Sequence, residues 1–213
     1  MPQEQRIPTE EIAAQARAAV DRAIQRHIPG LRSPSELIGE LGVTPKDVIY
    51  TQGTLKLYRY RPLCDEIYRV PIVLVMSLVS RSYILDLAKG QSFVEFLLRQ
   101  GYDVYLIDWG VPRPEHATLR LEDYVLDFIP ARVRAVTEDS GEPDVSLIGY
   151  CMGGQLAAMY TALHPDGPVK NLVCFTTPIN AEGMPLYRTW TDPAHFDLDR
   201  LIAALENIPP RVD

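Results

Sequence analysis

The chain has 213 residues, of which 46% are hydrophobic and 23% charged, a composition typical of one folded domain with a buried core. Its net charge of −7 argues against nonspecific binding to nucleic acid or anionic lipid. The longest apolar run, Pro71–Leu78, is far shorter than the roughly 20 residues of a membrane-spanning helix, and the charged N-terminus indicates no signal peptide. The three cysteines show no CxxC spacing, so we expect neither a disulfide framework nor a metal site, and a cytoplasmic location.

Residues 1–44 are predicted to form a helical extension. Apolar side chains recur every three to four residues over Thr9–Ile28, as on one face of a helix. This face could bind a partner or pack on the surface of the domain, and the sequence leaves both open. The next segment, Val48–Arg61, alternates in polarity and is rich in β-branched and aromatic residues, which predicts an edge hairpin with its turn at Gln52-Gly53.

From residue 70 the pattern changes to apolar, β-branched runs separated by helical segments, which is typical of strands covered on both faces. The expected strands are Val70–Leu78, Asp103–Trp109, Val145–Tyr150 and Lys170–Thr177. The expected helices are Ser92–Gln100, Leu121–Glu138 and Met152–His164. This alternation predicts an α/β core over residues 45–180, with a mostly parallel sheet, helices on both faces and a functional site at the C-terminal ends of the strands.

One short motif carries the chemistry. The sequence GYCMGG at residues 149–154 has the G-x-S-x-G spacing of a nucleophile elbow, with Cys151 in the place of serine. The elbow glycines are Gly149, Gly153 and Gly154, and small residues are needed there so that strand and helix can approach. Cys151 would lie at a helix N-terminus, where the dipole favours a thiolate. The alternative is a small buried cysteine in a βα turn; the flanking strand and helix and the third glycine favour the nucleophile.

An elbow of this kind predicts an oxyanion hole made of backbone N–H groups. One would come from Met152, directly after the nucleophile, and the other from the loop after the first parallel strand, around Leu78 or Val79. We take Met152 and Val79 as the pair. The other cysteines, Cys64 in a loop and Cys174 within a strand, are expected to be structural.

The segments PIVLVMSLVSRSYILDL, GYDVYLIDWG, LIGYCMGG and ALHP…VKNLVCFTTPI occur in this order, and over about residues 45–190 they resemble the catalytic domain of polyhydroxyalkanoate synthases. The resemblance implies an α/β-hydrolase core that polymerises (R)-3-hydroxyacyl-CoA through a Cys–His–Asp triad and releases coenzyme A. Cys151 matches the family nucleophile. The coenzyme A thioester would be the substrate, with no cofactor. The family usually has Pro-Pro and an Asn in the oxyanion region, whereas this chain has Met76-Ser77 and Ser80.

The short stretch before Cys151 resembles the class III and class IV catalytic subunits, which work with a second subunit. The resemblance therefore implies a second synthase subunit and the surface of a polymer granule as partners. In this family the triad Asp and His follow later strands. We therefore expect the chain to be truncated at its C-terminus, with residues 181–213 beginning the cap segment.

A cysteine nucleophile needs a base, and four histidines are available. His164 lies 13 positions along the helix from Cys151, roughly 20 Å away at about 1.5 Å per residue. His27 lies near the end of the N-terminal helix, His116 in a Pro-rich loop suited to solvent, and His195 in the expected cap. None has an evident orienting carboxylate, so we expect the chain alone not to turn over.

Two other readings of function remain open. A Cys hydrolase similar to dienelactone hydrolases also carries a G-Y-C-x-G-G elbow, although YILDL, IDWG and the N-terminal extension argue against it. A non-catalytic fragment that associates with a synthase would suit the expected truncation. Asp108 is expected to accept hydrogen bonds from loop amides rather than to act as a catalytic acid, Trp109 to pack beneath the site, and Tyr83 to lie in the core.

Overall fold

The computed structural model describes residues 41–180 and, beyond them, 183–190, 192–194, 196–197, 199–200 and 203, together with residues 18 and 22. Apart from those last two residues, the predicted helix Thr9–Ile28 lies outside the described part of the chain. Of the segment expected to begin a cap, the structure describes helix α5 (Pro185–Trp190) and a few residues after it. The cap therefore stays a prediction.

The described residues build one six-stranded sheet with the order β1-β2-β4-β3-β5-β6. Its strands are β1 (Lys46–Gln52), β2 (Leu55–Tyr60), β3 (Ile72–Val75), β4 (Val104–Asp108), β5 (Val145–Tyr150) and β6 (Val169–Phe175). β4, β3, β5 and β6 run parallel, whereas β1 and β2 form an antiparallel hairpin that pairs with β4. The predicted edge hairpin and mostly parallel sheet are confirmed.

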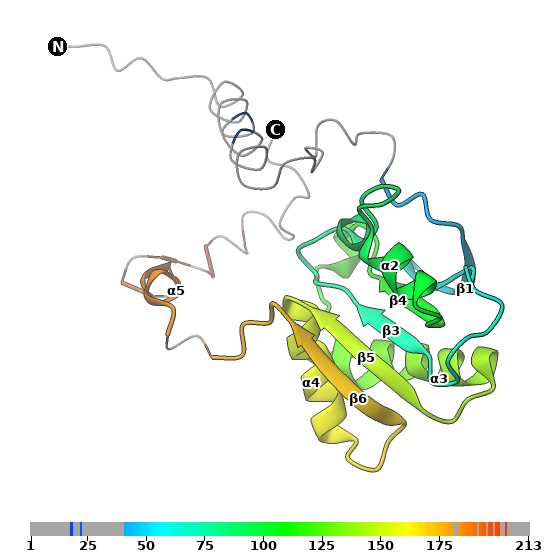
Figure 1. Ribbon diagram of the computed structural model, residues 1–213. Helices are drawn as coiled ribbons and strands as arrows, with labels where there is room; N and C mark the ends of the chain where they lie inside the picture. Colours follow the sequence, from blue (N-terminus) through cyan, green and yellow to red (C-terminus); the bar gives the residue numbers. More distant parts are fainter. Residues whose placement is uncertain are drawn as a thin grey trace.

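Helices cover both faces of this sheet, as predicted (Figure 1). Helix α2 packs on one face, and the π-helical segment η3 with α3 and α4 packs on the other. Their bounds are α2 (Phe93–Arg99), η3 (Asp123–Phe128), α3 (Ile129–Ser140) and α4 (Met152–Leu163), and two 3₁₀ turns are η1 (Ser82–Leu85) and η2 (Pro114–His116). Ser92 begins α2 by accepting a hydrogen bond from the N–H of Glu95 at 2.9 Å, a side-chain N-cap.

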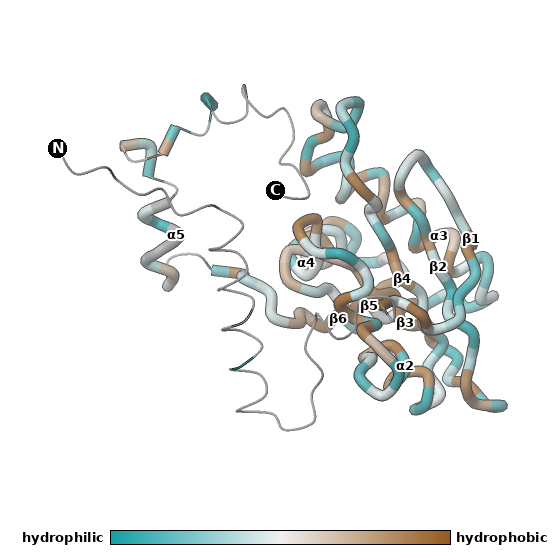
Figure 2. The backbone as a smooth tube through the Cα atoms, turned by 90° about the horizontal axis from the view of Figure 1, so that it is seen from above, coloured by the Kyte–Doolittle hydropathy of each residue, from teal (hydrophilic) through white to brown (hydrophobic). Residues whose placement is uncertain are grey.

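The central strands are apolar on both faces because each face meets a helix layer. On β3, Val73 and Val75 pack toward α3 and α4, while Ile72 and Leu74 pack toward α2. β4 alternates in the same way. The most hydrophobic part of the chain accordingly runs through β3, β4 and β5, and polar residues lie in the outer loops (Figure 2). This two-sided core fixes the edge of the sheet where the parallel strands end.

The structure corrects two predicted element boundaries. The strand predicted over Val70–Leu78 is shorter, Ile72–Val75, because the chain turns directly after Met76: the N–H of Val79 donates to Ser77 Oγ at 3.2 Å. The helix predicted over 121–138 begins at Leu121 as predicted, but it passes through the π-helical segment η3 and continues as α3 to Ser140. Pro130, two residues after the end of η3, has no N–H for the carbonyl one turn earlier, which favours the wider turns there.

One side-chain environment also differs from prediction. Tyr83, predicted to lie in the core, is 42% exposed, and Leu85 of the same turn η1 is the buried residue. Cys174 lies within a strand, as predicted, one residue before the end of β6, and its side chain is exposed. Helical periodicity cannot place a residue of a single 3₁₀ turn, and a strand at the edge of the described sheet leaves its side chains uncovered.

No helix in the described part of the chain is both long enough and apolar enough to cross a membrane.

Candidate active site

The C-terminal ends of β3, β4 and β5 meet at one edge of the sheet, where open α/β sheets hold their sites. Cys151 follows β5 and directly precedes α4. Its backbone has φ 53° and ψ −123°, a conformation that non-glycine residues rarely adopt and that costs of order 1–3 kcal/mol. Backbone strain of this kind, at a sharp strand-to-helix turn, is the feature that exposes the nucleophile in an elbow.

The three elbow glycines are required by close packing rather than by their own backbone angles. A Cβ on Gly149 would lie 2.3 Å from the Cα of Gly154, and one on Gly153 would lie 2.1 Å from the carbonyl oxygen of Val75. A Cβ on Gly154 would lie 1.9 Å from Thr177 Oγ1. Helix α4 therefore begins in direct contact with its own strand, with the end of β3 and with the segment after β6, as the sequence motif predicted.

Backbone hydrogen bonds hold Cys151 in this position. Its N–H donates to the carbonyl of Phe175 at 2.9 Å, and its carbonyl accepts from the N–H of Gly154 at 3.0 Å. The residue is half-buried, and its thiol is free. Met152 is the first residue of α4, so its N–H has no acceptor in a preceding helical turn and is available for an oxyanion.

A set of aromatic rings lies beside the elbow. Tyr150, which precedes the nucleophile, lies 5.8 Å from Phe175 between ring centroids, and Phe175 stacks on Phe93, the first residue of α2, at 5.7 Å. The rings come from β5, β6 and the start of α2, so they form an apolar wall on the α2 side of Cys151.

The segment from Met76 to Ser82, between β3 and η1, contains the second predicted oxyanion donor, and we call it the oxyanion loop. The side chain of Val79 is 86% exposed, and its N–H donates to Ser77 Oγ at 3.2 Å. This N–H is therefore already paired within the loop, and it can serve an oxyanion only by sharing or exchanging that bond. Ser77 itself is buried. The role of Val79 stays a prediction.

The end of β4 carries Asp108 and Trp109 against the same loop. Asp108 accepts hydrogen bonds from the N–H of Gly110 and from Ser82 Oγ, both at 2.9 Å, so its predicted role as an acceptor of loop groups is confirmed. Trp109 packs against the core on both faces of the sheet, as predicted, and its Nε1–H donates to the carbonyl of Met76 at 2.7 Å.

The two described histidines lie in different places. His164 follows the last residue of α4, at the end of the helix opposite Cys151, where its Nδ1 lies 2.9 Å from the carbonyl of Tyr160. The loop before His116 is exposed, as expected, but His116 itself is half-buried and lines a pocket. Its Nδ1 accepts from the N–H of Arg113 at 3.1 Å, which places the proton of the neutral ring on Nε2. His27 and His195 lie outside the described residues.

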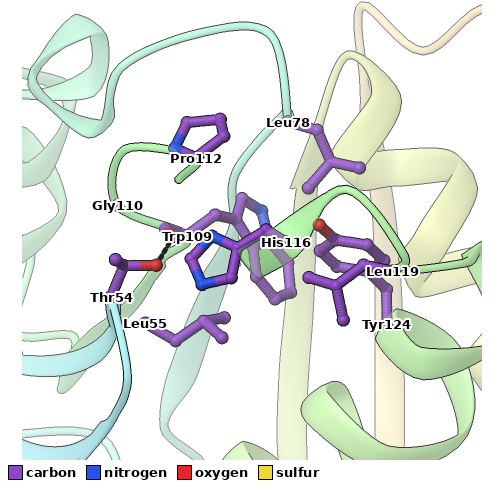
Figure 3. Close-up of a pocket in the computed structure, with 9 residues that line it drawn as sticks. All are labelled: Thr54, Leu55, Leu78, Trp109, Gly110, Pro112, His116, Leu119 and Tyr124. Carbon is purple, nitrogen blue, oxygen red and sulfur yellow. Dashed lines mark hydrogen bonds between the residues drawn. The ribbon is translucent and has the colours of Figure 1, made fainter. Parts of the chain in front are cut away.

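This pocket, of about 110 Å³, lies at the C-terminal end of β4, beside the oxyanion loop (Figure 3). It is lined by Thr54, Leu55, Leu78, Trp109, Gly110, Pro112, His116, Leu119 and Tyr124. The Tyr124 ring meets Trp109 edge-on at 5.2 Å, and burial raises the pKa of its hydroxyl. The sequence reasoning missed this pocket. Its signal was the aromatic pair Tyr124 and Phe128 at helical spacing, after a strand that is directly followed by Trp109.

β4 and β5 lie on either side of β3, so the strand beside the pocket and the strand that precedes Cys151 are about 10 Å apart, twice the spacing between neighbouring strands. Cys64 is half-buried, with its thiol 3.4 Å from the carbonyls of Leu98 and Arg99, in agreement with a structural role. Within the described residues, no cluster of three or more His, Cys, Asp or Glu side chains could hold a metal ion.

Comparisons with known proteins agree with this geometry. A family model for the alpha/beta hydrolase fold matches residues 83–201, and a model for the N-terminus of poly-beta-hydroxybutyrate polymerase (PhaC) matches residues 34–97. The chain is 21% identical to a Bacillus licheniformis lipase, BlEst2, with a TM-score of 0.46, over 62% of this chain and 26% of the lipase.

The curated relatives are polymerase subunits. The chain is 38% identical over 201 residues to the poly(3-hydroxyalkanoate) polymerase subunit PhaC of Haloferax mediterranei, covering 93% of this chain and 38% of that protein. It is 39% identical over 173 residues to the subunit of the same name from Allochromatium vinosum, covering 80% of this chain and 48% of that protein. The chain thus spans about half or less of the length of these relatives. The matches confirm the resemblance to polyhydroxyalkanoate synthases, and the chain belongs to the α/β-hydrolase fold family.

Proposed function

We propose that the chain supplies the nucleophilic part of a polyhydroxyalkanoate synthase, in which Cys151 carries the growing acyl chain. The single observation that carries the proposal is the strained backbone of Cys151, at φ 53° between β5 and α4, in a turn whose glycines leave no room for a Cβ. A cysteine that packed merely as a small hydrophobic residue would not need this conformation. The named function of the relatives supplies the substrate class.

In the acylation step, the Cys151 thiolate adds to the thioester carbonyl of (R)-3-hydroxyacyl-CoA. The carbonyl oxygen becomes an oxyanion that accepts hydrogen bonds from the N–H of Met152 and from the oxyanion loop at Val79. The bond from carbon to the coenzyme A sulfur then breaks, and coenzyme A leaves as a thiol with the proton that Cys151 gave up. The hydroxyl of another acyl unit next attacks the acyl carbon of the acyl-enzyme and forms the ester bond, while the bond from that carbon to the Cys151 sulfur breaks and the hydroxyl proton returns to Cys151.

Both steps need a base near the nucleophile. Within residues 41–180, no hydrogen bond joins either histidine ring to Cys151: His116 accepts from Arg113 and His164 pairs with Tyr160. We therefore propose that the 213-residue chain is acylated once and does not turn over by itself. A second synthase subunit, the surface of a polymer granule and a cytoplasmic location belong to the same proposal, and the free thiols of all three cysteines agree with the last of these.

The test is single-turnover acylation of the purified chain by 3-hydroxybutyryl-CoA, followed by intact mass spectrometry and peptide mapping. We expect one hydroxybutyryl group on Cys151, one equivalent of coenzyme A released, and no adduct on Cys151→Ala. Cys174→Ala is the matched control, because Cys174 is more exposed than Cys151 yet lies outside the elbow. An adduct on Cys174 or Cys64 would contradict the proposal. Rapid hydrolysis of a small lactone, lost in Cys151→Ala, would support the dienelactone-hydrolase alternative.

A further inference from the structure

Two consecutive residues hold the two ends of the oxyanion loop by hydrogen bonds: Asp108, the last residue of β4, and Trp109, which follows it. At its start, the carbonyl of Met76 accepts a 2.7 Å hydrogen bond from the indole Nε1–H of Trp109. At its far end, Ser82 Oγ donates a 2.9 Å hydrogen bond to Asp108 Oδ2. The chain between these points makes its own turn, closed by the N–H of Val79 on Ser77 Oγ.

The start of the loop also touches the elbow. The same Met76 carbonyl would lie 2.5 Å from a Cβ on Gly153, so the first turn of α4 rests on it directly. A shift of Met76 would therefore change the separation between the loop and the N–H of Met152, the two proposed sides of the oxyanion hole. Met76 is buried, and the indole is the donor that satisfies its carbonyl.

Asp108 and Trp109 are themselves held firmly. The other oxygen of Asp108 accepts from the N–H of Gly110, and the carbonyl of Trp109 accepts from Thr54 Oγ1 at 3.2 Å, which ties it to the β1–β2 hairpin (Figure 3). Gly110 has φ +72°, and a Cβ there would lie 2.3 Å from the carbonyl oxygen of Thr54. The end of β4 is thus anchored independently of the loop that it holds.

We propose that Asp108 and Trp109 are positioning residues that set the place of the oxyanion loop relative to Cys151. The inference rests on the proposed function, because the loop matters to catalysis only if an oxyanion forms there. Trp109 acts on the backbone at the start of the loop, through the carbonyl of Met76, and Asp108 acts on the side chain of Ser82 at its end.

The experiment compares two reactions of the same thiol in the purified 213-residue chain. Acylation by 3-hydroxybutyryl-CoA develops an oxyanion, whereas alkylation by iodoacetamide does not. We expect Trp109→Phe, which removes the indole N–H, and Ser82→Ala to slow acylation of Cys151 about tenfold or more, while alkylation changes less than about twofold. Ser82→Thr, which keeps the hydroxyl, should restore most of the rate. Tyr105→Phe, which removes a different β4 hydrogen bond, to Asp139, should change neither reaction.

Acylation at the wild-type rate in both Trp109→Phe and Ser82→Ala overturns the inference, and so does a parallel loss of acylation and alkylation, which would indicate damage to the elbow. Failure of the unaltered chain to acylate at Cys151 would overturn the proposed function and this inference with it. Amide hydrogen exchange tests these hydrogen bonds without any reaction at Cys151. The amides of residues 77–81 should exchange faster in Trp109→Phe and in Ser82→Ala than in the unaltered chain, and at an unchanged rate in Tyr105→Phe. Unchanged exchange in both variants also overturns the inference.

Discussion

The elbow and the oxyanion loop meet at the same edge of the sheet, yet they are built in different ways. The elbow is marked by one run of six residues, with strain at Cys151 and three glycines that pack closely within the turn, against the end of β3 and against the segment after β6. The oxyanion loop contains no such motif. Its ends are held by Trp109 and Asp108, which lie 33 and 26 positions further along the chain. One half of the site is therefore marked by a local sequence motif, whereas the other is defined only by contacts in the assembled sheet.

The sharpest way to break the elbow is to fill the space at Gly153. We expect Gly153→Ala to lower the free energy of unfolding by about 3 kcal/mol, because the new Cβ meets the backbone oxygens of Val75 and Met76, which cannot turn aside. Urea denaturation measures the change. Gly141→Ala is the control: it has φ +73° with open space around its Cβ, so only backbone strain of about 1 kcal/mol applies. Equal decreases in the free energy of unfolding for Gly153→Ala and Gly141→Ala would contradict the packing argument.

Gly154 offers a second test of the elbow, because its obstacle is a side chain. We expect Gly154→Ala to cost about 2 kcal/mol, since its Cβ would overlap Thr177 Oγ1. Adding Thr177→Ala should recover at least half of that cost, a coupling of about 1 kcal/mol in a double-mutant cycle followed by urea denaturation. The same Thr177→Ala change should not rescue Gly153→Ala. Additive costs in the cycle would show that Thr177 is not the obstacle.

The difference between the elbow and the oxyanion loop also explains which features of the fold and site could be predicted from the sequence. The alternation of apolar runs predicted the α/β sheet, and the GYCMGG spacing predicted the elbow, because both depend on neighbours in the chain. The burial of Tyr83 and the end of β3 were predicted wrongly, and the pocket lined by His116 was not predicted. Each of these features lies in an irregular segment whose shape depends on contacts with residues far away in the sequence. The periodicity of apolar residues cannot predict such contacts.

Because of the strain at Cys151, we expect glycine to be more favourable than alanine at this position, the reverse of their usual order. Glycine is normally less favourable than alanine, but at φ 53° a Cβ costs roughly 1–2 kcal/mol, more than the 0.5–1 kcal/mol that glycine loses in entropy. We therefore expect Cys151→Gly to be more stable than Cys151→Ala by about 0.5–1 kcal/mol, measured as the free energy of unfolding in urea. Both variants should lose acylation entirely. A more stable alanine variant would mean that the turn relaxes when the thiol is removed.

The start of α2 should carry a pH dependence of stability of its own. At the start of α2, the Glu95 carboxylate accepts a 2.7 Å hydrogen bond from the N–H of Gly90 and pairs with Arg99 at 2.6 Å. The Gly90 hydrogen bond, followed by the contacts with Arg99, lowers the pKa of Glu95 below its ordinary value of 4.5. Since the folded-state pKa is the lower one, this stabilisation is fully present above pH 4.5 and is lost as the pH falls through the lowered pKa.

The variant Glu95→Gln removes the charge of this side chain, so it measures how much the ionised carboxylate contributes to the stability of the fold. At neutral pH it should unfold about 1 kcal/mol more easily than the unaltered chain in urea, because the charged acceptor of the Gly90 N–H is gone. Below the lowered pKa, where Glu95 is protonated in both folded and unfolded chains, the difference between variant and parent should shrink toward zero. A difference that stayed constant with pH would assign the effect to packing of the side chain rather than to its charge. Because Glu95 contacts neither the elbow nor the oxyanion loop through any of these bonds, alkylation of Cys151 at neutral pH should be the same in both proteins.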